Sequence, residues 1–242
     1  MKGIKVVLGV VASALLLSGC NLNNTSKGGM IGAAAGGAAG TGLGAAIGAL
    51  IGGSHGAKVG AAIGAGVGVA GGTTAGVLIG KKMDKAKAAA EAALQDATVE
   101  TTTDTNGLDA VKVTFDNGIL FAVGKSNLQS SAQASLKKFA ANVLNVYTDC
   151  DVAIYGYASS DGSEETNLML SQNRAFAVKG YLTGSCGVKE SQIKSTVGYG
   201  ENPEYLVRDA NGNEDRAASR RVEVYLYASE AMIKAANEGT LQ

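Results

Sequence analysis

The chain has little of the residue types on which many enzyme and metal sites depend. It holds one histidine, His55, and three cysteines in 242 residues. Because His55 lies in a glycine-rich turn, no histidine remains elsewhere for a Ser-His-Asp or Cys-His arrangement. No Cys-x-x-Cys pair or histidine cluster indicates zinc. We therefore expect no catalytic site, no bound metal and no cofactor.

The chain also lacks an excess of charge of either sign. Lys and Arg number 21, and Asp and Glu number 21, so the net charge is zero. Binding to nucleic acid depends on an excess of basic side chains that pair with phosphates. We therefore expect no nucleic-acid partner.

The N-terminus has the pattern of an export signal. Lys2 and Lys5 precede an apolar run, Val6 to Leu17, which is shorter than the roughly 20 residues that cross a bilayer. The following Leu-Ser-Gly-Cys resembles a bacterial lipobox. This implies a signal peptide over 1–19, cleavage before Cys20 and acylation of Cys20, including palmitate. Asn21 favours sorting to the outer membrane; the alternative is an ordinary signal with a chance cysteine.

A glycine repeat follows a short tether over 20–27. Glycine occupies every fourth position from Gly28 to Gly80, and this stretch contains no acidic residue. Small-xxx-small spacing lets helices approach closely. We expect a helical hairpin over 28–80, with helices near 29–52 and 58–80 that each extend about 33–36 Å. Membrane insertion and a soluble or oligomer-buried helix pair remain alternatives, and a homo-oligomer is a possible assembly.

Residues 81–97 are rich in alanine and lysine, which favour helix. We interpret this segment as a charged, solvated helical linker. The globular domain then starts at 98 and continues to 228, and 229–242 form a tail with a frayed helix.

Alternating strand patterns and helical patterns follow one another over 98–228. Asn106-Gly107 predicts a hairpin turn between strands near 99–103 and 109–115. Helices are expected over 130–147 and 163–183. Further strands are expected over 151–157, 194–199 and 219–227, with a polar loop over 201–218. This order predicts an α+β fold in which helices pack on a mixed sheet.

The most informative segment is a strand, turn and helix between Gly156 and Val178. Asn167, Ser171 and Arg174 recur at i, i+4 and i+7, which places them on one helix face. Turn N–H groups, a helix N-terminus and a guanidinium together suit an anion. The alternatives are structural: Arg174 pairs with an acid such as Asp161 or Glu165, and Asn167 and Ser171 brace the turn.

This segment resembles the peptidoglycan-binding domain of the OmpA family. The matching positions are Gly156, Gly162, Asn167, Leu170, Ser171, Arg174 and Ala175, with Gly198–Pro203 and Arg220–Val224 further on. The resemblance implies a C-terminal β-α-β-α-β-β sandwich and a site that binds the diamino acid of the peptidoglycan stem peptide. Arg174 would bind its carboxylate, and Arg221 is the preferred second arginine.

The chain departs from the family pattern at the residue expected to bind the ammonium group. Ser159 stands where the family has an aspartate, and Asp161 is a second candidate for that role. Ser219 likewise replaces a family asparagine. The predicted peptidoglycan site is therefore Ser159, Asp161, Asn167, Arg174 and Arg221.

Two cysteines, Cys150 and Cys186, remain in the expected globular domain. An even number of cysteines in an exported protein suggests one disulfide. The OmpA-like topology implies that both lie at the same end of the domain. Two free buried thiols are the alternative.

These features predict an outer-membrane lipoprotein whose periplasmic domain binds peptidoglycan non-covalently. Two other functions stay open. In the first, the glycine repeat carries the function and forms a pore or a membrane-remodelling oligomer. In the second, the globular domain binds another envelope partner through its altered site.

Overall fold

The computed structural model describes residues 74–104 and 107–241. The signal peptide, Cys20, the tether and the glycine repeat up to residue 73 lie outside the described residues, so predictions about them stay predictions. The elements, in chain order, are α3 (Thr74–Ala93), β1 (Ala97–Thr103), β2 (Asp109–Asp116), α4 (Asn117–Leu120), α5 (Ser130–Phe139), the π-helical turn η1 (Ala140–Leu144), β3 (Cys150–Tyr157), α6 (Glu164–Cys186), the 3-10 turn η2 (Glu190–Gln192), β4 (Ile193–Gly198), α7 (Arg216–Ser219), β5 (Arg221–Ala228) and α8 (Glu230–Asn237).

Five strands form one mixed sheet in the order β1-β2-β5-β3-β4. The adjacent pairs β1–β2, β2–β5 and β5–β3 are antiparallel, and β4 runs parallel to β3. Because a parallel pair needs a crossover, α6 connects β3 to β4 across the sheet. The predicted α+β architecture is confirmed, with strand and helix positions within a few residues of those expected.

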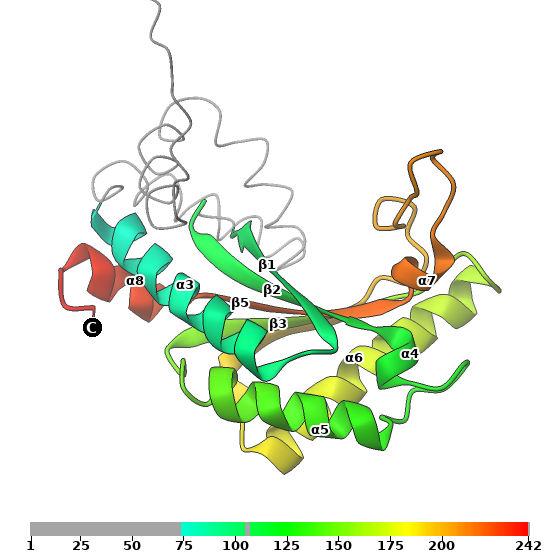
Figure 1. Cartoon of the computed structure of the whole chain (residues 1–242), viewed down its shortest axis with the longest axis horizontal. Helices are drawn as coiled ribbons and strands as arrows, with labels where there is room; N and C mark the ends of the chain where they lie inside the picture. The colour runs from blue at the N-terminus through cyan, green and yellow to red at the C-terminus, as the bar shows by residue number, and fades with distance from the viewer. Residues whose placement is uncertain (1–73, 105–106, 242) are drawn as a thin grey trace, which may run out of the picture.

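Helices α3, α5 and α6 pack on one face of the sheet (Figure 1). Alternate strand residues point into this layer, such as Val152 and Ile154 in β3 and Val222 in β5. Helix α6 lies especially close to β3 and β4 at two glycines. A Cβ atom on Gly156 would come within 2.2 Å of the Ser171 carbonyl oxygen, and one on Gly198 within 2.2 Å of the Gln172 nitrogen. Glycine at these positions brings the polar face of α6 onto the sheet.

The opposite face of the sheet carries a cluster of tyrosines. Tyr155, Tyr157 and Tyr225 are buried, and Tyr199 and Tyr205 pack against them. The last strand contributes Glu223 and Tyr225 to this face, where they are 5% and 7% exposed, because packed aromatic rings cover this side as well.

Helix α3 belongs to the hydrophobic core. Ile79, Met83, Ala86 and Ala90 are buried on one face and pack with β2, η1 and α8. The expectation of a solvated linker over 81–97 is therefore wrong for this face. Alanines at helical spacing form an apolar stripe on this face of the helix. The composition of the segment does not reveal this stripe, because it also contains many charged residues.

The C-terminal helix α8 is docked, whereas a frayed tail was expected. Met232, Ile233 and Ala236 are buried against the core, and the Ser229 hydroxyl caps the helix by accepting from the Met232 N–H at 3.1 Å. Within residues 74–104 and 107–241, the helices are all too short or too polar to cross a bilayer.

Candidate functional site

The predicted site residues gather at one end of the sheet, where β3 leads into α6 and a long loop follows β4. Asn167 in the first turns of α6 holds the two loops together. Its Nδ2 donates to the carbonyls of Ser159 at 3.1 Å and Asp161 at 2.9 Å, and also to the Glu201 carboxylate. Asn167 is 5% exposed. The structural alternative for this residue, bracing the turn, is therefore what the structure shows.

Ser171 binds the start of the loop that follows β4. Its hydroxyl accepts from the Gly200 N–H at 2.9 Å and donates to the Leu168 carbonyl at 2.9 Å. Gly200 has φ of +59°, a conformation that glycine adopts without a steric penalty. Asn167 and Ser171, which match the family pattern, thus hold the loops of the site in place through hydrogen bonds.

Ser159 and Asp161 form one hydrogen-bonded unit with Arg220, which is not among the predicted site residues. The Ser159 hydroxyl donates to Asp161 Oδ2 at 3.1 Å, and Arg220 Nη1 lies 3.3 Å from both groups. Ser159 itself is 3% exposed. Asp161 therefore brings its charge within hydrogen-bond reach of the position where the family has its acid.

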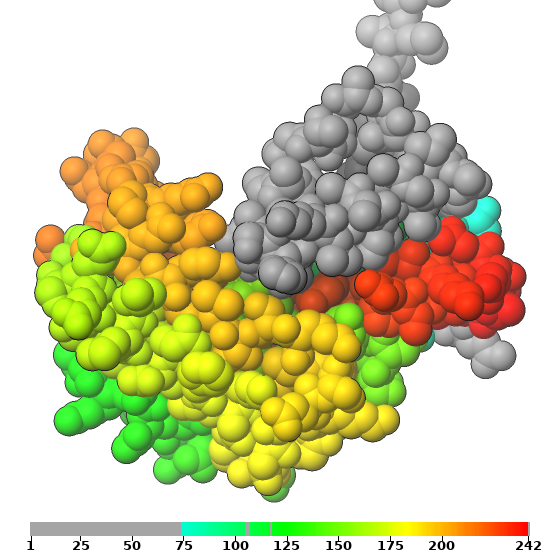
Figure 2. Space-filling model, turned by 180° about the vertical axis from the view of Figure 1, so that it is seen from behind, coloured from blue at the N-terminus to red at the C-terminus, as the bar shows by residue number. Residues whose placement is uncertain are grey.

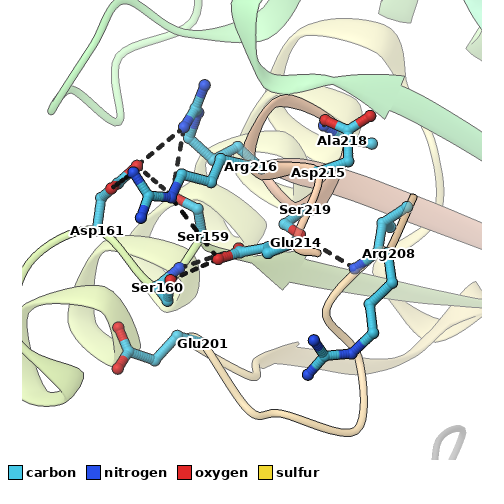
Figure 3. Close-up of polar contacts among 12 residues, drawn as sticks. Ser159, Ser160, Asp161, Glu201, Arg208, Glu214, Asp215, Arg216, Ala218 and Ser219 are labelled. Atoms are coloured by element: carbon cyan, nitrogen blue, oxygen red, sulfur yellow. Dashed lines mark hydrogen bonds and ion pairs between the residues drawn. The ribbon is translucent and has the colours of Figure 1, made fainter. Parts of the chain in front are cut away.

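The turn that carries Asp161 is clamped to the segment before β5 (Figure 3). Arg216 Nη1 lies 3.0 Å from Asp161 Oδ1, and the Ser160 N–H donates to Glu214 Oε1 at 3.1 Å. The Ser160 hydroxyl also donates to the Glu214 carboxylate. Burial acts to raise the pKa of Glu214, but the hydrogen bonds from Ser160 and the charge of Arg216 outweigh it and leave that pKa below its ordinary value.

Arg174 lies behind this clamp as a buried cation. The residue is 2% exposed, its Nε donates to the Lys125 carbonyl at 3.0 Å, and its guanidinium lies 5.4 Å from the centre of the Phe121 ring. Burial, with the charge of Arg220 nearby, lowers the pKa of Arg174 to about 10. No carboxylate among the described residues pairs with it, so the alternative of a structural partner in Asp161 or Glu165 is not what the structure has.

Arg221 lies on the other face of the sheet. Its guanidinium stacks 4.0 Å from the centre of the Tyr157 ring, and its Nε bonds Glu223 at 2.7 Å. The structure brings Arg220, and not Arg221, together with Ser159 and Asp161. Arg221 belongs to the tyrosine cluster. The alternation of strand residues could have identified Arg220. It lies two positions before Val222, so both share a face of the strand, and Val222 points toward the helices.

A cleft of 430 Å³ opens beside Arg220, between residues 116–123 and 215–220. Phe121 lines it and also contacts Arg174, so the buried cation and the cleft share a wall. Asp116 and Asp215 add carboxylates to its rim. The arrangement can hold a small ligand that carries both an anionic and a cationic group.

The two cysteines of the described residues are free thiols. Cys150 is buried at the start of β3, Cys186 is half-buried at the end of α6, and burial raises the pKa of both. The predicted disulfide is absent from the structure, which has the alternative of two free thiols. Across residues 74–104 and 107–241, no group of histidine, cysteine and acidic residues has the geometry of a metal site.

The fold and the site define a class: an α+β domain with a buried arginine beside a charged cleft at the end of its sheet. Residues 120–220 match the model of the OmpA family. The chain therefore carries an OmpA-family domain, as the sequence motif predicted.

Several known proteins are similar to parts of this chain. Outer membrane porin F of Pseudomonas aeruginosa is 32% identical over 127 residues, which are 52% of this chain and 35% of the relative. The peptidoglycan-associated lipoprotein of Mesorhizobium japonicum is 33% identical over 97 residues, 40% of this chain and 56% of the relative. Among solved structures, the cell wall anchor of the T6SS from Pseudomonas aeruginosa superposes with a TM-score of 0.46 at 24% identity, covering 61% of this chain and 97% of that chain.

The similarity to these two curated relatives is confined to part of each of them. The chain spans about a third of the length of porin F and just over half of the lipoprotein. The family match starts at Leu120 and ends at Arg220, so α3, the β1–β2 hairpin, β5 and α8 lie outside it.

Proposed function

We propose that the OmpA-family domain binds peptidoglycan non-covalently and that Arg174 receives a carboxylate of the stem peptide. One observation carries the proposal: Arg174 is a cation at 2% exposure without a carboxylate partner among the described residues. A buried unpaired charge is costly, and a ligand carboxylate would compensate it with a bidentate pair. The relative named peptidoglycan-associated lipoprotein supports the same class of ligand.

The proposal extends to the place of the protein in the cell. We infer that Cys20 lipids and the glycine repeat hold the chain in the outer membrane, with the domain in the periplasm. The outer-membrane and lipoprotein names of the relatives support this location. The function is then structural: the protein links the membrane to the cell wall without catalysis.

Co-sedimentation with purified sacculi tests the binding. Arg174→Ala in the detergent-solubilised full chain should weaken binding roughly 10–150-fold, since a charge-assisted hydrogen bond to a buried group contributes about 1.5–3 kcal/mol. Arg208→Ala is the matched control, because Arg208 is an exposed arginine whose Nη1 bonds only the Gly212 carbonyl in its own loop. Undiminished sedimentation of a folded Arg174→Ala protein would refute the proposal.

A further inference from the structure

Asp161 holds two arginines on separate carboxylate oxygens. Oδ1 accepts from Arg216 Nη1 at 3.0 Å. Oδ2 accepts from Arg220 Nη1 at 3.3 Å and from the Ser159 hydroxyl at 3.1 Å. The charge of Asp161 is therefore already neutralised by side chains of the same chain.

The two arginines are not equally tied to the site. Arg220 has a 39% exposed side chain, bonds Ser159 as well as Asp161, and lines the cleft. Arg216 has a 61% exposed side chain, places its Nε 3.9 Å from Glu214 Oε2, and lies at the start of the four-residue helix α7. Figure 3 shows Arg216 and Asp161 facing each other across the junction of the two loops. Because exposed ion pairs contribute little, Arg216 is the cation that a ligand can displace at low cost.

We propose that Arg216 is a specificity-determining residue that competes with the ligand's ammonium group for Asp161. This inference rests on the proposed function. A diamino acid that places its carboxylate on Arg174 brings its side-chain ammonium to Asp161 Oδ1, and Arg216 leaves that oxygen for solvent. Arg220 keeps Oδ2 and holds the carboxylate in place.

The exchange explains how the site works without an acid at position 159. One cation replaces another on Asp161, so binding creates no unpaired carboxylate and no new net charge at this oxygen. Ser159, at 3.1 Å from Oδ2, orients Asp161 instead of contacting the ammonium. The chain thereby binds a ligand that carries an ammonium beside a carboxylate, with an affinity that Arg216 reduces.

Titration with a pair of peptides tests the proposal. The probes are an N-terminally blocked stem peptide with a free diamino-acid side chain and the same peptide acetylated on that side-chain amine. With the full chain in detergent, Arg216→Ala should raise the affinity for the free-amine peptide up to about fivefold, which corresponds to about 1 kcal/mol for an exposed ion pair. Affinity for the acetylated peptide should stay the same.

Two further variants separate the outcomes. Asp161→Asn should lower affinity for the free-amine peptide and remove the effect of Arg216→Ala. Arg208→Ala removes the same charge from the loop that precedes α7 and should change the affinity for neither peptide. If Arg216→Ala shifts both peptides equally or neither, while Arg174→Ala still weakens binding, the competition is refuted and peptidoglycan binding stands. If the unaltered protein binds neither peptide nor sacculi, the proposed function fails with it.

Discussion

At the scale of single residues, two adjacent arginines take opposite roles because a strand alternates. Arg220 and Arg221 are neighbours in sequence, yet one contacts Asp161 and the other lies with Tyr157 and Glu223. Arg221 and Glu223 have side chains 11% and 6% exposed, so their ion pair is shielded from solvent. The pair of Arg220 and Asp161 is 39% and 49% exposed. One arginine therefore stabilises the sheet, and the other serves the site.

Alanine substitutions at the two arginines should separate these roles. Arg221→Ala leaves the buried Glu223 carboxylate without its cationic partner and should cost about 3–5 kcal/mol of unfolding free energy. Arg220→Ala should cost about 1 kcal/mol or less but weaken sedimentation with sacculi. Urea unfolding followed by tyrosine fluorescence reports the domain, because all 8 tyrosines lie between Tyr147 and Tyr227 and the chain has no tryptophan. Equal effects of the two substitutions on stability would contradict this division.

At the scale of elements, the glycine-rich part of the chain ends in a helix that completes the core. Helix α3 begins at Thr74, crosses the sheet and buries Met83 at 1% exposure. Among its charged residues, Lys87 pairs with Glu91 on the same helix, and Lys82 pairs with Asp149 just before β3. The β1–β2 hairpin follows directly, with buried aspartates on both sides of its turn, Asp104 at 2% and Asp109 at 6% exposure.

Met83→Ala tests whether α3 is part of the folded core. Truncating this buried side chain should cost about 2–5 kcal/mol through lost contacts and a cavity. Lys85→Ala, two residues away on the exposed side, should stay within about 0.5 kcal/mol of the unaltered protein. Urea unfolding of both variants measures the difference. Two neutral substitutions would mean that α3 is a solvated linker after all.

The hairpin predicts an unusual pH dependence through Asp109. Burial, reinforced by the charge of Asp84, raises the pKa of Asp109 from 3.8 to about 6, and its Oδ2 finds no hydrogen-bond partner in the part of the chain that the structure describes. The folded state then binds this proton more tightly than the unfolded state. The stability that this bound proton contributes is lost as pH rises from about 4 through about 6. At pH 7 the free energy of unfolding is then lower by on the order of 2–3 kcal/mol.

Asp109→Asn should remove that cost. The variant should be more stable than the unaltered protein at pH 7, and the gap should close as pH falls to about 4. Asp116→Asn changes an exposed carboxylate at the other end of the same strand and serves as the control. Urea midpoints measured across this pH range decide, and a gap that does not vary with pH would contradict the assignment.

At the scale of the whole molecule, the site and the start of α3 lie at opposite ends of the described residues. Helix α3 starts beside α8, and the loop of residues 201–215 projects from the far end of the sheet (Figures 1 and 2). A domain tethered through its N-terminus would therefore present the site away from the tether. This geometry suits the proposed link between a membrane and a cell wall.

Lipidation at Cys20 is the prediction on which that link depends. Cys20→Ala should leave the protein without fatty acid, because the thiol and the amino group exposed by cleavage are the acylated atoms. Metabolic labelling with a radioactive fatty acid measures this directly. Cys186→Ala is the control, since it removes a half-buried thiol of the domain and should keep the label. Full labelling of Cys20→Ala would refute the lipid anchor.

The sequence by itself determined the α+β fold, the family domain and the framework of the site. Period-two and helical patterns report which face of an element is buried, and Gly156, Asn167, Ser171 and Arg174 stand at a spacing that local backbone geometry dictates. Tertiary structure alone decided which distant side chains meet Asp161, because Arg216 and Arg220 reach it across 55 and 59 positions of chain. It also decided that α3 is core and that tyrosines cover the second face. Those outcomes depend on packing between elements. A local sequence pattern does not contain the balance of buried area and charge that decides this packing.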